Sequence, residues 1–331
     1  MRDMNAWKLR FSMVATLAAI FGLTTLVFSA VMLWVGYFNL ITVGVLVVVL
    51  NVGQWLLSPY LVGAIYRVKE MKTDENPKLH QMVTDLSKKS GISTPKLMLS
   101  KMPMPNAFAY GSPLSGSRVA VTEGLLKHLD DGEVEAVIGH ELGHLKHRDV
   151  QVMMVVSFLP ALFYYIGYSM MLSGMFGGDR RDNGGGNNAV IGIAFMAFSW
   201  VLTLFTLYLS RIREYYADRH SASVVVNGAE KLSTGLVTIV EESKRSGKLT
   251  REQAKNNSAF KALFISDPDR ANLDSAELHA NNFTDKKELL RQTLAKKPTG
   301  GDAFAEIFST HPNIIKRLRA LQELSQNPQT A

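Results

Sequence analysis

Two histidines and the glutamate between them carry the clearest chemistry in this sequence. In His140-Glu141-Leu142-Gly143-His144 the two imidazoles stand four residues apart, so on a helix both project from one face. Their nitrogen atoms can bind a single zinc ion, and Glu141 can take a proton from a water molecule at that ion. The H-E-x-x-H spacing therefore predicts one Zn2+ per chain. The alternative is a packed amphipathic helix with two incidental histidines.

The residues around this motif predict the helix that it needs. Asp130 is a candidate N-cap, and Glu133, three residues later, completes a capping box. An apolar stripe follows at helical spacing, formed by Val134, Val137, Ile138, Leu142 and Leu145. The opposite face has small residues, and its two glycines would weaken an isolated helix: Ala136, Gly139 and Gly143. We therefore expect another helix to approach that face closely.

A catalytic zinc ion usually has three protein ligands and one open position. The 331 residues include no cysteine, so the third ligand must be a histidine or a carboxylate. His147 is the nearest candidate, but on an unbroken helix it lies about 10 Å along the axis from His140. That separation excludes His147 from a site shared with His140 and His144.

Glu214 is the better candidate for the third ligand. It lies in Arg213-Glu214-Tyr215-Tyr216-Ala217-Asp218, just beyond an apolar segment. Asp218 is one turn further along the same helical face, where it could accept a hydrogen bond from a ligating histidine. The alternative for Glu214 is an ion pair with Arg211 or Arg213 at the end of that segment.

Long uncharged segments predict an integral membrane protein. No charged residue occurs from Phe11 to Tyr66, which is long enough for two helices of about 20 residues, near 11–35 and 40–58. Two further uncharged segments, 150–178 and 189–210, are joined by a polar, glycine-rich turn. We expect four transmembrane helices, two before and two after the metal-binding motif. The alternative for the second pair is a buried helical hairpin of a soluble protein.

Lysine and arginine near the ends of these segments predict the orientation. Eleven of them lie on one side, between Arg2 and Arg219, whereas the other side has Arg180 and Arg181. Both termini and the metal-binding motif should therefore lie in the cytoplasm, at the plasma membrane. The net charge of +7 has a simple explanation at that membrane surface, so no nucleic-acid partner is expected.

The predicted spans divide the chain into four parts. Residues 1–58 form an N-terminal transmembrane hairpin, and residues 151–210 form a second one. Residues 59–150, which include the metal-binding helix, and residues 211–331 should assemble one cytoplasmic domain, because neither piece carries a complete site. A helix over 309–324 closes the chain.

The two cytoplasmic pieces predict an α+β fold that is mainly helical. A helix opens at Asn76-Pro77 and ends at Gly91. Three short strand-like runs follow, separated by Pro, Gly and Ser turns: 96–100, 107–110 and 118–121. We expect these runs to form a small antiparallel sheet packed on the metal-binding helix.

Three motifs together resemble the HtpX membrane zinc endopeptidases. They are the His140–His144 motif, Arg213–Asp218 after two apolar segments, and Ser309-Thr310-His311-Pro312 with Arg317. Asn106-Ala107-Phe108-Ala109 also looks like that family's upstream strand. The likeness covers nearly the whole chain and is less clear over 244–302.

The resemblance implies a gluzincin-like zinc peptidase domain on the cytoplasmic face of a bacterial or archaeal membrane. It implies that His140, His144 and Glu214 are the zinc ligands and that Glu141 is the catalytic carboxylate. It also places His311 and Arg317 near the substrate, where such sites commonly add a donor for the developing oxyanion.

Residues outside the ligand set could have other roles than those the resemblance implies. His311 could instead cap the closing helix, and Arg317 could pair with an acidic group on the surface. The strand Asn106–Ala109 could bind substrate backbone as an added strand if it lies at a sheet edge, or be an ordinary internal strand.

These expectations combine into a membrane-bound zinc metalloendopeptidase. Zinc lowers the pKa of its bound water to about 7, and Glu141 would pass the proton to the leaving amine. The motif lies close to the membrane, so the polypeptide substrates would be misfolded membrane proteins at the cytoplasmic face, as the HtpX quality-control role implies. The alternatives are a transporter or receptor with a structural metal site, or a proteolytically inactive scaffold. None of the four apolar segments has an internal ionisable residue, which counts against transport.

Overall fold

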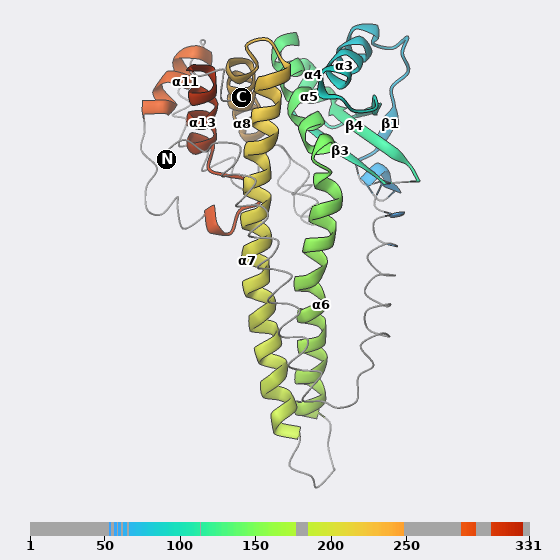
Figure 1. The fold of residues 1–331 in the computed structure, drawn as a ribbon, viewed down its shortest axis with the longest axis vertical. Coiled ribbons are helices and arrows are strands. Elements are labelled where there is room, and N and C mark those ends of the chain that lie inside the picture. Colours follow the sequence, from blue (N-terminus) through green and yellow to red (C-terminus); the bar gives the residue numbers. More distant parts are fainter. Residues whose placement is uncertain are drawn as a thin grey trace.

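The computed structural model describes residues 66–112, 114–176, 185–247, 286–295 and 306–326, together with scattered positions between 53 and 64. These residues form a broad domain of helices and sheet from which two long helices, α6 and α7, extend side by side (Figure 1). The first predicted span lies outside the described residues. The second is described only at Gly53, Leu56 and Leu57.

Four strands of the described chain form one mixed sheet in the order β1-β2-β4-β3. β1 (Val68–Glu70) pairs antiparallel with β2 (Lys96–Ser100), and β3 (Ala107–Ser112) pairs antiparallel with β4 (Gly116–Thr122). β2 and β4 run parallel. The prediction of an antiparallel sheet is therefore wrong at this central pair.

The parallel pair arises from the path of the chain. After β2 the chain crosses to the edge of the sheet, forms β3 there, and returns through a tight turn to place β4 beside β2. Gly111 in this hairpin has a φ of +156°, and a Cβ there would lie 2.3 Å from the carbonyl oxygen of Gly116. Local hydrophobic spacing predicts strands, but it does not say which strands become neighbours.

The helices that support the sheet begin and end largely where the sequence predicts. α3 (Pro77–Ser90) is capped by Asn76 and ends at Gly91, which has the left-handed φ of +69°. α4 (Glu123–His128) follows β4, and α5 (Asp131–Lys146) carries the metal-binding motif. α5 opens with the predicted capping box: the side chains of Asp130 and Glu133 each accept from the other's backbone N–H.

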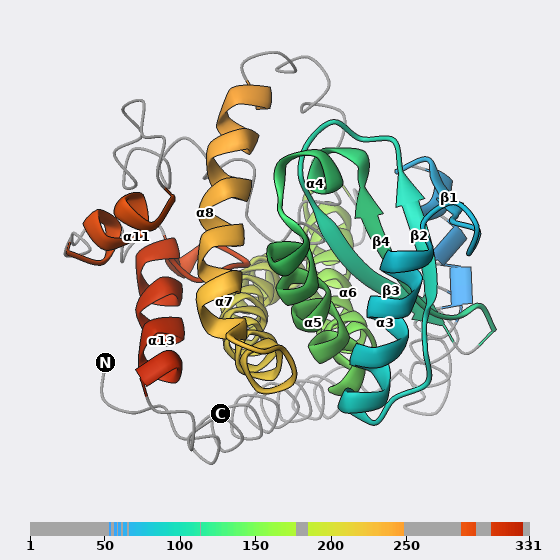
Figure 2. The ribbon, with the colours of Figure 1, turned by 90° about the horizontal axis from the view of Figure 1, so that it is seen from above.

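The small-residue face of α5 packs on α7 (Gly185–Val224), as expected from its glycines. A Cβ on Gly143 would lie 3.0 Å from Cα of Ala217, and one on Gly139 would lie 3.2 Å from Oγ of Ser221. The Ser221 hydroxyl donates to the carbonyl oxygen of Ala136 at 2.6 Å. Seen from above, α5 lies between α7 and the sheet (Figure 2). This close contact sets the separation of the side chains on the two helices.

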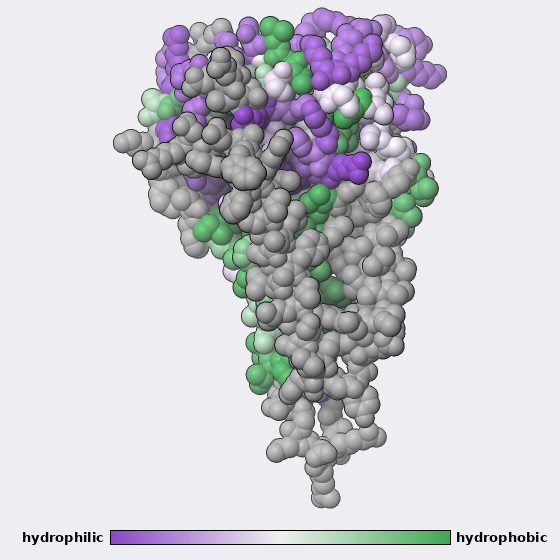
Figure 3. All heavy atoms as spheres, viewed as in Figure 1, coloured by the Kyte–Doolittle hydropathy of each residue, from purple (hydrophilic) through white to green (hydrophobic). Residues whose placement is uncertain are grey.

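The α6–α7 stalk consists of α6 (Asp149–Phe176) and the part of α7 beside it. The two helices approach closely where Gly167 faces Gly192, because a Cβ on either would lie 2.5–2.6 Å from the other's carbonyl oxygen. Phe163 stacks on Phe195 at 5.6 Å between the ring centroids. Within the described residues, Asn188–Val224 is a helix long and apolar enough to cross a membrane, and only 28% of its most apolar stretch is buried. Hydrophobic residues gather on this narrow part, and hydrophilic ones on the broad end (Figure 3).

Three further helices complete the described domain: α8 (Gly228–Gly247), α11 (Lys286–Ala295) and α13 (Ile314–Gln326). The closing helix begins at Ile314 rather than at 309. Pro312 disfavours helical backbone at the residue before it, and the Asn313 side chain accepts from the backbone N–H of Ile315 at 2.9 Å. One hydrophobic core joins α5 and the sheet to α8 and α13, so side chains from both sequence pieces share it.

Candidate metal centre

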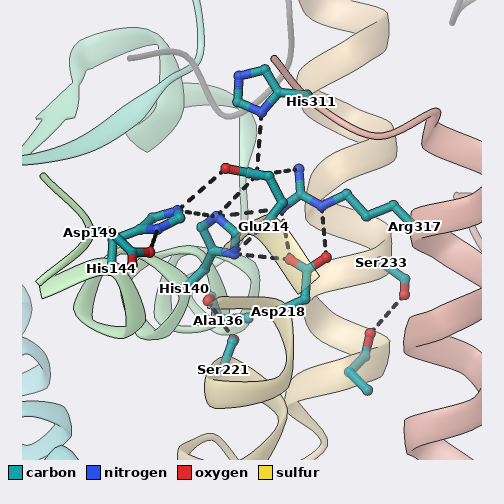
Figure 4. A network of polar contacts seen from close by, with 11 residues as sticks. Ala136, His140, His144, Asp149, Glu214, Asp218, Ser221, Ser233, His311 and Arg317 are labelled. Carbon is teal, nitrogen blue, oxygen red and sulfur yellow. Dashed lines mark hydrogen bonds and ion pairs between the residues drawn. The ribbon is translucent and has the colours of Figure 1, made fainter. Parts of the chain in front are cut away.

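α5 and α7 bring two histidines and one glutamate together (Figure 4). Nε2 of His140 lies 3.2 Å from Nε2 of His144, and these nitrogens lie 3.6 and 3.5 Å from the carboxylate oxygens of Glu214. In a tetrahedral zinc site with bonds of about 2.0–2.1 Å, neighbouring ligand atoms stand about 3.3–3.4 Å apart. Each nitrogen lies nearest a different Glu214 oxygen, and with one atom taken from each side chain the three ligand atoms lie within 4.8 Å of one another, so they can hold a single metal ion.

Asp218 holds the other ring nitrogen of His140. Its Oδ1 lies 2.9 Å from Nδ1 of His140, and it is buried one turn beyond Glu214 on α7. Two guanidinium nitrogens of Arg317, Nε and Nη2, each donate to this carboxylate at 2.7 Å. A carboxylate on the outer nitrogen fixes the orientation and tautomer of a ligating imidazole.

Asp149 holds His144 in the same way, and sequence reasoning missed it. Nδ1 of His144 lies 2.7 Å from Oδ2 of Asp149, whose Oδ1 lies 3.1 Å from Nε of Arg213. Asp149 is the first residue of α6, and Arg148 before it has a φ of +54°, which turns the chain between the two helices. The available sequence signal was an acidic residue at the edge of an apolar segment, five positions after His144.

These partners change the pKa values on that side of the site. Burial by itself would lower the pKa of His144, but the hydrogen bond to Asp149 and the negative charge of Glu214 raise this pKa above its ordinary value. Burial would raise the pKa of Asp149, but the positive charge of Arg213 holds it below the ordinary value. Asp149 is therefore an ionised acceptor, and it makes His144 a more basic metal ligand.

Glu141 and His147 lie outside the group that could hold the metal. Glu141 is buried on α5 between the two histidines, which leaves it beside the site without being part of the ligand group. His147 caps the C-terminal end of α5, and its ring lies 5.4 Å from that of Tyr216. The helix ends at Lys146, so the chain turns away at His147 rather than continuing the face that carries His140 and His144.

His311 reaches Glu214 from the segment before α13. Its Nδ1 lies 3.3 Å from Oε2 of Glu214, and within the described chain neither ring nitrogen makes a hydrogen bond. The ring is nearly buried. The helix-capping alternative for His311 is wrong, because Asn313 caps α13. A buried imidazole with donor capacity to spare beside the ligands is suited to contact a substrate oxygen.

Arg317 is placed behind the ligands and away from solvent. It is 2% exposed, so the surface-pair alternative is wrong. Its Nη1 lies 3.3 Å from Oε2 of Glu214, while Nε and Nη2 bind Asp218. The two carboxylates raise the pKa of Arg317, so it stays charged although it is buried. This placement favours a role in holding Glu214 and Asp218 over the expected direct contact with substrate.

Arg211 and Arg213 were the alternative ion-pair partners for Glu214, and neither pairs with it. Nε of Arg213 faces Asp149, and Nη1 of Arg211 lies 2.8–3.1 Å from three backbone carbonyl oxygens of the segment before His311. The ion-pair alternative for Glu214 is therefore not what the structure shows. Its oxygens face His140, His144, His311 and Arg317 instead.

The expected substrate strand lies at one edge of the described sheet, as β3. Ala107 and Ala109 face the main core, whereas Phe108 faces a second cluster with Tyr66 and Tyr110. Asn106, just before the strand, is buried, and its backbone N–H donates to Oγ1 of Thr122 at 2.9 Å. Both faces of the strand are packed, and its outer edge pairs with no other strand of the described chain, so that edge is where a peptide backbone would pair.

Known proteins match this chain over most of its length. The solved structure described as the crystal structure of S. mikatae Ste24p is similar with a TM-score of 0.48 and 17% identity, covering 95% of this chain and 66% of that one. The Protease HtpX homolog of Thermoplasma acidophilum is 36% identical over 330 residues, covering 97% of this chain and 98% of the relative. The Protease HtpX homolog of Aeropyrum pernix is 39% identical over 274 residues, 82% of each.

The resemblance of the motifs to HtpX is thus confirmed along nearly the whole chain. Residues 73–325 also match the sequence profile of Peptidase family M48, and this range includes all the residues around the candidate metal centre. The chain therefore belongs to peptidase family M48, as an HtpX-type membrane metalloprotease.

Proposed function

We propose that the protein is a zinc-dependent endopeptidase whose metal is held by His140, His144 and Glu214. The observation that supports this most strongly is the convergence of the three side chains: the two Nε2 atoms lie 3.2 Å apart, and each lies 3.5–3.6 Å from one oxygen of the Glu214 carboxylate. When bound, zinc acts as a Lewis acid and lowers the pKa of water to about 7. A transporter or receptor with a structural metal site has no comparable support.

Glu141 supplies the proton transfer in this proposal. Its carboxylate takes a proton from the water that attacks the peptide carbonyl, and it delivers that proton to the amine nitrogen as the C–N bond breaks. Glu141 is buried beside His140, so little bulk water competes for its proton. His311 donates a hydrogen bond to the carbonyl oxygen as negative charge develops on it.

Three residues position the site in this proposal and do not react. Asp218 orients His140 and Asp149 orients His144, each through the ring nitrogen that faces away from the metal. Arg317 holds Asp218 and Glu214 at once through its three nitrogens. Asn106 and β3 bind the substrate backbone along the open edge of the sheet.

The place of the site favours membrane-associated polypeptides as substrates. Glu214 lies four residues beyond the uncharged segment 189–210, which is about 6 Å of helix. A cleavage site at that distance from the membrane surface can reach loops of other proteins where they emerge from the bilayer. We therefore propose misfolded or damaged membrane proteins as substrates, cut at the cytoplasmic face of a four-span protein in a quality-control role.

The test combines metal content with peptide cleavage by the full chain in detergent. Wild-type protein should contain one zinc per chain and degrade casein. Glu141→Gln should keep the zinc and the fold but lose about 10²–10⁴-fold in turnover, because the general base is gone. Glu135→Gln, which removes a carboxylate of α5 that pairs with Lys231 of α8, is the matched control and should cleave normally. A Glu141→Gln protein that keeps a tenth of wild-type turnover contradicts the proposal, as does a zinc-free wild type that cleaves.

A further inference from the structure

The segment Glu306–Ser309, which leads to His311, shows two apolar side chains to its surroundings. Ile307 and Phe308 are 41% and 45% exposed, whereas Glu306 and Ser309 on either side are buried. The ring of Phe308 lies 5.7 Å from that of Trp200 on α7, so the segment lies against the stalk (Figure 1). Two adjacent apolar side chains beside an apolar helix form one continuous apolar surface.

Three carbonyl oxygens of this segment and the Glu306 carboxylate have partners within the protein. Nη1 of Arg211 lies 2.8, 3.1 and 2.8 Å from the carbonyl oxygens of Glu306, Ile307 and Ser309. The carboxylate of Glu306 pairs with Lys316 and accepts from the backbone N–H of Asn313 at 3.2 Å.

In water these carbonyl oxygens would need no such partner. In a lipid environment an unsatisfied carbonyl costs several kcal/mol, so each must be bonded within the protein. Arg211, whose Nη1 lies within hydrogen-bonding distance of the three carbonyls, also has its guanidinium carbon 5.8 Å from the ring centre of Tyr208, next to the apolar part of α7. The segment is thus built to present hydrocarbon outward while its backbone stays hydrogen-bonded.

The neighbouring side chains on α7 match the boundary between lipid and water. Tyr208 is exposed, and the first charge after the apolar part of α7 follows at Arg211, whereas the exposed Trp200 lies near the middle of the uncharged segment 189–210. Tryptophan and tyrosine are enriched where a membrane protein crosses the headgroup region, and arginine there keeps its charge in the polar layer. The segment Glu306–Ser309 reaches from this boundary toward the apolar part of α7, because Arg211 faces its carbonyl oxygens while the Phe308 ring lies beside that of Trp200.

We propose that Ile307 and Phe308 insert into the surface of the phospholipid bilayer and that this contact anchors the segment that carries His311. The anchor begins four residues before His311 and is tied to it through Ser309, whose Oγ accepts from the backbone N–H of His311 at 3.2 Å. The bilayer surface then helps to hold the segment that carries His311 in place beside the metal ligands. This contact is distinct from the predicted transmembrane helices, because the segment that makes it follows α6 by more than a hundred residues in the sequence.

The test uses the fact that the chain has no cysteine, so one introduced cysteine carries the only label. Ile307→Cys, bearing an environment-sensitive fluorophore, is reconstituted as full chain into phosphatidylcholine nanodiscs with or without nitroxide-labelled lipid. Phe308→Cys is the second probe, in case one substitution disturbs the loop. Val226→Cys is the matched control, because Val226 is apolar and 71% exposed but lies just beyond the end of α7, whose last residue, Val224, is about 20 Å along the helix axis from Arg211.

The probes at Ile307 and Phe308 should be quenched by nitroxide lipid at least threefold more than the probe at Val226, and they should be shielded from aqueous iodide. Equal lipid quenching at all three positions would overturn the proposal. A probe that neither quencher reaches would also overturn it, because protein would then cover the segment. The readout is fluorescence, so it is independent of peptide cleavage and of the proposed zinc chemistry.

Discussion

Asp149 and His144 are joined across the turn between α5 and α6, with 2.7 Å between the carboxylate oxygen and the ring nitrogen. This contact connects the first residue of the stalk to a candidate metal ligand. Arg213 of α7 binds the same carboxylate, so all three helices meet at Asp149.

Asp149→Asn should weaken zinc binding about 10–100-fold, because a neutral amide is a poorer acceptor for the ring N–H of His144 and no longer attracts Arg213. Competition with a chelator of known affinity measures this change. Glu135→Gln is again a suitable control, since its carboxylate pairs with Lys231 away from the ligands. If Asp149→Asn binds zinc as tightly as wild type, Asp149 does not orient the ligand.

Glu214→Ala should leave the purified protein poor in zinc, whereas His147→Ala should retain close to one zinc per chain. The reason is geometric: the Glu214 oxygens lie 3.5–3.6 Å from both ligand nitrogens, while His147 only caps α5. Metal analysis after dialysis distinguishes the two variants, with circular dichroism to verify their fold. Full zinc in Glu214→Ala and little in His147→Ala would reverse the ligand assignment.

His311→Ala should retain zinc and melt near the wild-type temperature, but cleave about 10²–10³-fold more slowly, with little change in KM. His311→Gln keeps an N–H donor and should recover part of the lost turnover. His128→Ala, which removes a histidine 3.5 Å from Glu242 elsewhere in the fold, should cleave normally. A His311→Ala protein that unfolds early yet cleaves normally per folded molecule would make His311 structural only.

The four-span topology makes a prediction about labelling in intact cells. A cysteine at Asn187, at the start of α7 on the side of the stalk away from the metal-binding domain, should react with a membrane-impermeant maleimide from outside. A cysteine at Val226 should react only after the cells are permeabilised, because the domain is expected in the cytoplasm. Reaction of both cysteines in intact cells would contradict the proposed orientation.

The parts of the site that sequence could predict depend on local patterns. The capping box at Asp130 and Glu133 predicted the start of α5, and the small residues Gly139 and Gly143 predicted a close helix, which is α7. Both patterns act over one or two turns of helix, so they can be read without knowing the fold. Glu214 followed from its distance to an apolar segment, which is also a local property.

The parts that sequence could not predict depend on how distant elements meet. Asp149 reaches His144 only because the chain turns at Arg148, which adopts a left-handed backbone rare for a residue other than glycine. Arg317 was expected at the surface or the substrate, but α13 packs so that its side chain is buried against Asp218. The parallel pairing of β2 with β4 likewise depends on the crossing of the chain to β3. Each of these contacts depends on segments that meet only in the folded chain, although an acidic residue five positions after His144 is visible in the sequence.

α7 is one uninterrupted helix of 40 residues that carries Trp200 in its apolar part and Glu214, Asp218 and Ser221 in the domain. A continuous helix transmits a tilt at one end to the other, since no break in hydrogen bonding lets the halves move separately. Apolar helices tilt when the hydrocarbon thickness around them changes. In the proposed topology, a change in membrane thickness that tilts α7 would move Glu214 relative to the two histidines on α5, so lipids of different acyl length would change the ligand geometry without touching the site.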